Sequence, residues 1–139
     1  MEHIDYHLKY EIPSERKSIK LVENILSDLK CKLSLTKDFY YNLLIAVTEA
    51  VNNAIIHGNC CDIAKITEIE IDAVFPNLKI TVNDNGNGFD FLNLDDPRIP
   101  ENIYKENGRG VFLIKELAEK VEFVRTPKGM SVIMFFKLS

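Results

Sequence analysis

The sequence has little of what marks disordered, membrane-spanning or secreted proteins. Glycine and proline supply only 6 and 5 of the 139 residues, which excludes a collagenous or low-complexity chain. No segment approaches the roughly 20 apolar residues that span a bilayer, and residues 1–5 lack the basic start and apolar run of a secretory signal. We therefore expect a single cytoplasmic domain, residues 1–139, with no membrane partner.

The sequence also has few cysteines and no excess of basic residues. Cys31, Cys60 and Cys61 lack the C-x-x-C spacing of a zinc or redox site, and we expect reduced thiols packed at or near the core. Lys and Arg number 17 against 21 Asp and Glu, so the net charge of −4 gives no overall attraction for nucleic acid. The G-x-x-x-x-G-K-[ST] and G-x-G-x-x-G nucleotide motifs are also absent, so any nucleotide must bind by another arrangement.

Hydrophobic periodicity in the first half of the chain predicts one strand and two helices. Apolar and polar residues alternate from His3 to Ile12, as in a half-buried strand. Apolar residues spaced by three and four then predict a helix capped by Ser14 that ends near Cys31. The longest helix is predicted from Thr36 to Gly58, where glycine ends it.

The second half of the chain reads as strands around one more helix. Strands are expected at 66–74, 78–82, 121–126 and 131–138, with a helix from 108 to 120. Residues 89–107 lack a regular apolar period, and we expect a long loop that acts as a lid. This order predicts an α+β fold, a two-layer α/β sandwich with a mixed, largely antiparallel sheet.

Three polar side chains of the longest predicted helix share one face. Glu49, Asn53 and His57 are spaced i, i+4, i+8, which places them in line. An Asn oxygen near phosphates can hold Mg²⁺, and a Glu one turn away can take a proton from a nucleophile. Alternatively, these residues cap the helix end or face water.

Two glycine-containing segments complete the set of candidate residues. Asp84 ends a strand and can accept a hydrogen bond from an amino group such as that of adenine, while Gly86 and Gly88 allow close backbone approach. Gly108-Arg109-Gly110 opens a helix whose N-terminal amides can bind phosphate. Taken singly, the first segment is equally a tight turn and the second a flexible helix entry.

The order of these motifs resembles the Bergerat-type ATP site of the GHKL superfamily. Residues 49–59 resemble its N box, residues 84–89 its first glycine box and residues 107–114 its second. The E-A-V-x-N-A-x-x-H-G form of the N box and the small size are most similar to the RsbW-like anti-sigma-factor serine kinases. The resemblance covers essentially the whole chain.

This resemblance implies a histidine-kinase-like ATPase domain that uses ATP and Mg²⁺. It makes Glu49 the general base, Asn53 the Mg²⁺ ligand and Asp84 the adenine contact. The nucleotide would be cradled by Gly86, Gly88, Gly108, Arg109 and Gly110. The implied substrate is a serine of a small STAS-domain anti-anti-sigma protein, with a sigma factor as the alternative partner and a homodimer as the assembly. One departure is Met130, which stands where relatives commonly carry Thr, so a hydroxyl contact near adenine is missing.

Other functions stay open at this point. The chain could be a non-catalytic ATP-binding switch that grips a partner without turnover. An ATPase of the topoisomerase type would need a transducer domain, and a structural domain without nucleotide would need three chance motifs. The exposed Arg16, Lys17 and Lys20 are expected to help dock a protein partner, unless they only keep the helix soluble.

Overall fold

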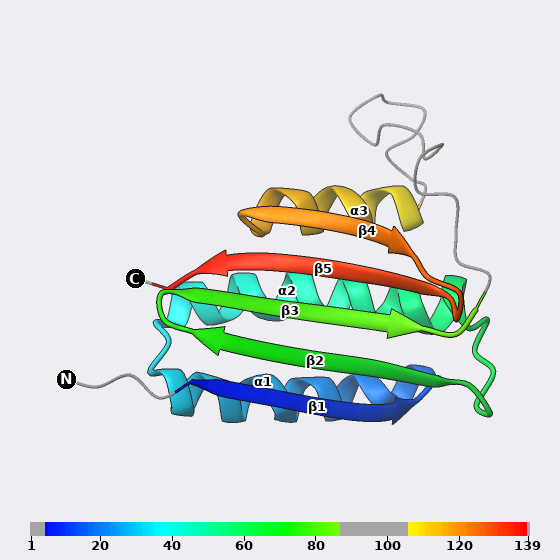
Figure 1. Cartoon of the computed structure of the whole chain (residues 1–139), viewed down its shortest axis with the longest axis horizontal. Coiled ribbons are helices and arrows are strands. Elements are labelled where there is room, and N and C mark those ends of the chain that lie inside the picture. The colour runs from blue at the N-terminus through cyan, green and yellow to red at the C-terminus, as the bar shows by residue number, and fades with distance from the viewer. Residues whose placement is uncertain (1–4, 87–105, 139) are drawn as a thin grey trace.

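The computed structural model describes residues 5–86 and 106–138, which form a five-stranded sheet with helices on one face (Figure 1). The elements in chain order are β1 (Tyr6–Pro13), the 3₁₀ turn η1 (Arg16–Ser18), α1 (Ile19–Leu33), α2 (Lys37–Asn53), the π-helical turn η2 (Ala54–Gly58), β2 (Ile66–Val74), β3 (Asn77–Asp84), α3 (Glu106–Leu117), β4 (Lys120–Arg125) and β5 (Met130–Lys137). The predicted α+β sandwich is confirmed.

The strand order is β1-β2-β3-β5-β4, and all four described pairings are antiparallel. The sequence predicted a mixed, largely antiparallel sheet, and the described sheet is antiparallel throughout. Two helices, α1 and α2, connect β1 to β2, so the chain re-enters the sheet in the opposite direction. Strand β4 runs parallel to β3, but β5 lies between those two strands and is antiparallel to both.

The core lies between the sheet and the helices because one face of each element is apolar. On β2, Ile69, Ile71 and Ala73 point inward and are buried, whereas the alternate residues on the other face are polar and partly exposed. Helix α2, whose Leu43 and Val47 are fully buried, lies behind β3 and β5 (Figure 1). Each such side chain contributes about 1.5–3 kcal/mol on burial, which fixes α2 and everything it carries.

The predicted long helix from Thr36 to Gly58 is confirmed, as α2 followed by η2. The Thr36 hydroxyl caps the start by accepting from the Phe39 amide at 3.2 Å. The last five residues form a π-helical turn that ends at Gly58. π-turns commonly occur at functional sites.

Two local predictions are wrong. Ser14 does not cap a helix: it is fully buried, and its hydroxyl donates to the carbonyl of Lys65 at 2.6 Å. Cys31, Cys60 and Cys61 are exposed rather than packed near the core. Cys31 lies on the exposed face of α1, and Cys60 and Cys61 follow the end of η2 in left-handed backbone conformations.

Helix α3 begins at Glu106, two residues before the predicted start, so Gly108-Arg109-Gly110 lies inside its first turns. The rest of the predicted lid, apart from Glu106 and Asn107, lies outside the described residues, as do His3 and Gly88. Among the described residues, no helix is both long and apolar enough to cross a bilayer.

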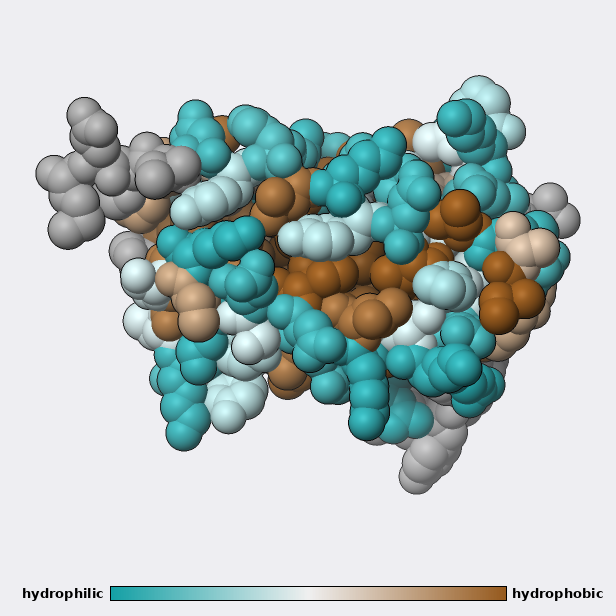
Figure 2. All heavy atoms as spheres, turned by 90° about the horizontal axis from the view of Figure 1, so that it is seen from below, coloured by the Kyte–Doolittle hydropathy of each residue, from teal (hydrophilic) through white to brown (hydrophobic). Residues whose placement is uncertain are grey.

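One edge of the sandwich exposes part of the core. Figure 2 views the molecule from the side where β1 and α1 lie, and apolar atoms form a band between two polar margins. The partly buried side chains of Tyr6, Leu8, Tyr10 and Ile25 pack against the core at this edge. The helix-covered face beside it carries the candidate site.

Candidate functional site

Helices α2 and α3 enclose a cavity of about 430 Å³ on the helical side of the sheet. Its lining residues are Glu49, Asn52, Asn53, Ile56, His57, Arg109, Gly110 and Leu113. The two helices thus bring together four of the residues predicted from separate motifs. His57 also lines the cavity, in agreement with the predicted alignment of Glu49, Asn53 and His57 on one helix face.

Gly110 allows the close approach of α3 to α2. A Cβ atom at this position would lie 2.8 Å from Glu49 Oε2, 3.4 Å from Asn53 Nδ2 and 3.6 Å from Asn53 Oδ1. The first distance is shorter than a van der Waals contact, so a side chain would displace the Glu49 carboxylate. Glycine at this position therefore sets the separation between the carboxylate, the amide and the backbone of α3.

The Asn53 amide is buried in this cavity, with 5% of the residue exposed. Within the described residues, its Nδ2 has no hydrogen-bond partner. Buried amides without a protein partner are rare and indicate a missing ligand or water. Oxygen ligands suit Mg²⁺, so Asn53 fits a Mg·nucleotide: Oδ1 could hold the ion and Nδ2 could donate to a phosphate oxygen.

Asp84 lies at the end of β3, only 4% exposed, with its carboxylate against the Cα of Gly58. A Cβ on Gly58 would lie 2.3 Å from Asp84 Oδ2, and a Cβ on Gly129 would lie 2.0 Å from the Asp84 carbonyl oxygen. Asp84 Oδ1 accepts from the Gly86 amide at 3.0 Å. Asp84 is thus held on two sides: its carboxylate lies against Gly58 of η2, and its backbone carbonyl lies against Gly129 of the β4–β5 turn.

Burial raises the pKa of Asp84 above its ordinary value of 3.8, and the backbone N–H groups of Gly86 and Met130 partly offset this. Met130 pairs with Asp84 across β3 and β5. The Met130 side chain is buried, so this residue contributes its amide to the Asp84 carboxylate and its thioether side chain to packing.

One continuous helical segment, α2 with η2, joins the cavity around Glu49 to the neighbourhood of Asp84. Gly58 contacts Asp84, and Glu49 lies nine residues earlier on α2 and η2. At 1.5 Å per residue this is about 13 Å along the axis. Asp84 and Gly86 do not line the cavity around Glu49, so a ligand that reaches both must be elongated.

Gly58 and Gly129 are site residues that the sequence analysis did not assign. The signal for Gly58 was available, because it closes the segment that resembles the N box. Nothing local to the β4–β5 turn shows that Gly129 packs on Asp84. Gly108 lies in the first turn of α3, and Gly88 lies outside the described residues.

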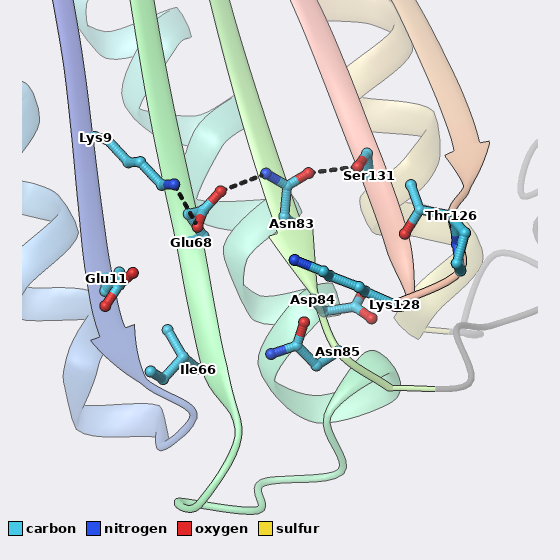
Figure 3. Close-up of a pocket in the computed structure, with 11 residues that line it drawn as sticks. Lys9, Glu11, Ile66, Glu68, Asn83, Asp84, Asn85, Thr126, Lys128 and Ser131 are labelled. Atoms are coloured by element: carbon cyan, nitrogen blue, oxygen red, sulfur yellow. Dashed lines mark hydrogen bonds and ion pairs between the residues drawn. The ribbon is translucent and has the colours of Figure 1, made fainter.

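A second cavity, of about 490 Å³, lies on the open face of the sheet and also reaches Asp84 and Asn85 (Figure 3). Its polar side chains already bond one another. Lys9 pairs with Glu68 at 3.2 Å, Asn83 Nδ2 donates to Glu68 Oε1 at 3.0 Å, and the Ser131 hydroxyl donates to Asn83. None of the α2 residues lines this cavity, so we assign the candidate site to the helical side.

The long helix formed by α2 and η2 thus carries Glu49 and Asn53 one turn apart at the cavity. The histidine kinase-like ATPase domain matches residues 12–136, and the chain belongs to this family. The Bacillus cereus (strain ATCC 10987 / NRS 248) serine-protein kinase RsbW is 29% identical over 133 residues, covering 91% of this chain and 82% of that protein.

Further matches agree in fold and family. The Bacillus anthracis (strain A0248) serine-protein kinase RsbW is 28% identical over 133 residues, with the same coverage. The crystal structure of the RsbU and RsbW domains of Rv1364c from Mycobacterium tuberculosis superposes with a TM-score of 0.70 at 15% identity. It covers 96% of this chain, which spans about a third (32%) of that chain. At this identity the likeness shows the fold.

Proposed function

We propose that this chain is a Mg·ATP-dependent protein serine kinase that phosphorylates a small STAS-domain anti-anti-sigma protein and controls a sigma factor. The observation that carries the proposal is the cavity in which Glu49, the unpartnered Asn53 amide and Gly110 converge. The names of the RsbW relatives support the same activity.

Different residues along the elongated site bind the adenine base and the Mg²⁺-bound phosphates. Asp84 accepts from the adenine amine, and Gly86 and Gly88 let the base approach the backbone. Asn53 holds Mg²⁺, which when bound neutralises phosphate charge during transfer. Arg109 and the amides around Gly108 and Gly110 contact the phosphates.

Glu49 takes the proton from the serine hydroxyl in the transfer step. The serine oxygen forms a bond to the γ-phosphorus while the bond from that phosphorus to the β,γ-bridging oxygen breaks, and ADP leaves. Positioning and charge neutralisation supply most of the catalysis in such transfers. Glu49 and Asn53 are neighbours one helical turn apart and both line the cavity, which supports assigning the base and the ion ligand to them.

The test is a single-turnover reaction of the purified protein with γ-labelled ATP, Mg²⁺ and STAS-domain proteins from the same organism. The account expects label on one serine of one of these proteins, lost in Glu49→Gln. Tight ATP binding and partner capture with no transfer would instead establish the non-catalytic switch.

The same domain is proposed to dock its partner through a basic strip, Arg16, Lys17 and Lys20. All three are exposed on η1 and the first turn of α1, with Lys17 in a 3.8 Å pair with Glu15. Charge reversal at Arg16 and Lys20 should slow partner association in a salt-sensitive way and leave ATP affinity unchanged. If the variant associates with its partner at the parent rate, the strip does not dock the partner and only keeps the helix soluble.

A cytoplasmic homodimer of a single domain, residues 1–139, completes the proposal. A cytoplasmic kinase would meet ATP and its protein substrate in one compartment. Sedimentation at micromolar concentration should give twice the 15.9 kDa mass. A monomer at that concentration would contradict the proposed homodimer and leave the kinase proposal intact.

A further inference from the structure

A fully buried amide, Asn59, follows η2 directly and bonds in three directions. Its Nδ2 donates to Ser14 Oγ at 2.8 Å and lies 3.3 Å from both Thr67 Oγ1 and the Ile66 carbonyl. Its Oδ1 accepts from the Asn85 amide at 2.9 Å. One side chain therefore joins the segments that follow β1, η2 and β3 to the start of β2.

The hydroxyl partners of Asn59 are themselves fixed. Ser14 Oγ donates to the Lys65 carbonyl at 2.6 Å and lies 2.9 Å from Thr67 Oγ1. Ser14 and Thr67 are both fully buried. A buried polar network whose members all have partners is rigid and specifies one arrangement of the backbone. This network therefore leaves Asn59 Oδ1 little freedom to move away from Asn85.

The end of η2 and the turn that follows β3 also pack closely through their backbones. A Cβ on Gly86 would lie 1.5 Å from the Gly58 carbonyl oxygen, and a Cβ on Gly58 would lie 2.3 Å from Asp84 Oδ2. The Gly86 amide bonds Asp84 Oδ1 at 3.0 Å. Two consecutive amides, those of Asn85 and Gly86, are thus held, one by Asn59 and one by Asp84 itself.

We infer that Asn59 is a positioning residue for nucleobase selectivity, because it fixes the turn that orients the Asp84 carboxylate. The inference rests on the proposed function, in which Asp84 accepts from the adenine amine. Asn59 itself bonds the Asn85 backbone and three groups behind the turn. Its loss should free the Asn85 amide and let the Asp84 carboxylate rotate or shift, which weakens a directional hydrogen bond to adenine.

A purely structural role predicts a different pattern. If Asn59 only stabilised the fold, its removal would lower the unfolding temperature and leave the ratio of ATP to GTP affinity unchanged. Thr36→Ala is a suitable control for stability, because it removes a single side-chain cap at the other end of α2, far along the helix from Gly58.

The test is calorimetric titration of Mg·ATP and Mg·GTP into the wild-type protein, Asn59→Ala, Asn59→Asp and Thr36→Ala. We expect the wild type to prefer ATP and Asn59→Ala to lose about tenfold in ATP affinity with GTP affinity nearly unchanged, as for one lost hydrogen bond. Asn59→Asp keeps an oxygen for the Asn85 amide but loses the donor toward Ser14, Ile66 and Thr67. It should therefore recover only part of the preference, and Thr36→Ala should retain all of it.

Two results would overturn the inference and are distinguishable. A wild-type ATP preference that survives in Asn59→Ala removes the positioning role and leaves the proposed function in place. No ATP preference in the wild type removes the proposed adenine contact at Asp84 and the inference with it. If Asn59→Ala does not fold, Ser14→Ala removes one partner of Asn59, and its ATP preference should fall about threefold. An unchanged preference in Ser14→Ala would count against the inference.

Discussion

Gly110→Ala should separate stability from catalysis, because the new methyl group enters the cavity beside Glu49. A Cβ at this position would lie 2.8 Å from Glu49 Oε2, whereas non-bonded heavy atoms pack near 3.5 Å. The carboxylate must therefore move by about 0.5–0.7 Å. The distances to the Asn53 amide, 3.4 and 3.6 Å, are close to ordinary contacts, so that side chain can stay in place.

The expected changes in stability and rate have opposite directions. Gly110 is the fifth of twelve residues in α3, and replacing glycine by alanine inside a helix is worth about 0.8–1 kcal/mol. The contact falls on the end of a flexible side chain, so we expect the melting temperature to rise by about 2–5 °C or stay unchanged. A misplacement of 1 Å can cost about 100-fold in rate, so transfer should fall about tenfold or more.

The assay pairs thermal unfolding with single-turnover phosphoryl transfer, and calorimetry confirms that ATP affinity changes by less than about threefold. Ser27→Ala, at an exposed position of α1, is the matched control: it improves helix propensity without approaching the cavity and should leave transfer unchanged. Transfer by Gly110→Ala at the parent rate would refute the argument that the position of the Glu49 carboxylate limits catalysis.

Three further changes test other parts of the site. Glu49→Gln should keep ATP affinity and lose transfer, whereas Asn53→Ala should weaken Mg·ATP binding in calorimetry; the reverse pattern would exchange their roles. Gly86→Ala should cost about 2–3 kcal/mol in urea unfolding, because its Cβ would meet the Gly58 carbonyl oxygen; a loss under 0.5 kcal/mol contradicts this close packing. Burial raises the pKa of Asp84, so its ionisation disfavours the folded state: the stability linked to the protonated acid is full below pH 3.8 and lost as pH rises through the raised pKa. Asp84→Asn should therefore gain stability relative to wild type between pH 4 and 8, and a difference independent of pH would contradict the shift.

Much of the fold could be predicted because periodicity reports which side of an element is buried. The alternation in β1 and the three-and-four spacing in α1 and α2 are properties of single elements, and the structure confirms them. The face shared by Glu49, Asn53 and His57 followed from helix geometry alone.

Residues whose roles depend on partners far away in the chain could not be predicted from the sequence. Ser14 has the residue type and position of a helix cap, yet its hydroxyl bonds Lys65 and contacts Asn59 and Thr67, about 50 residues away in sequence. The exposure of Cys60 could not be derived either, since residue type favours burial while the turn after η2 faces outward.

The contact of Gly129 with Asp84 is another feature that no local pattern contains. It arises because β5 pairs with β3 rather than with β4 alone, which brings the β4–β5 turn to the end of β3. The strand order therefore decides this contact, and no single element of the sequence contains that order. The motifs named candidate residues, and helix geometry gave the spacing within α2, but the distances between residues on different elements could not be predicted from the sequence.

The most direct test of the account is a crystal structure of the protein with Mg²⁺ and a non-hydrolysable ATP analogue. The account predicts the adenine amine within hydrogen-bond distance of the Asp84 carboxylate, the ion on Asn53 Oδ1 and the γ-phosphate in the cavity that Glu49 and Gly110 line. A nucleotide bound in the cavity on the open face of the sheet, or with its base beside Glu49, would contradict it.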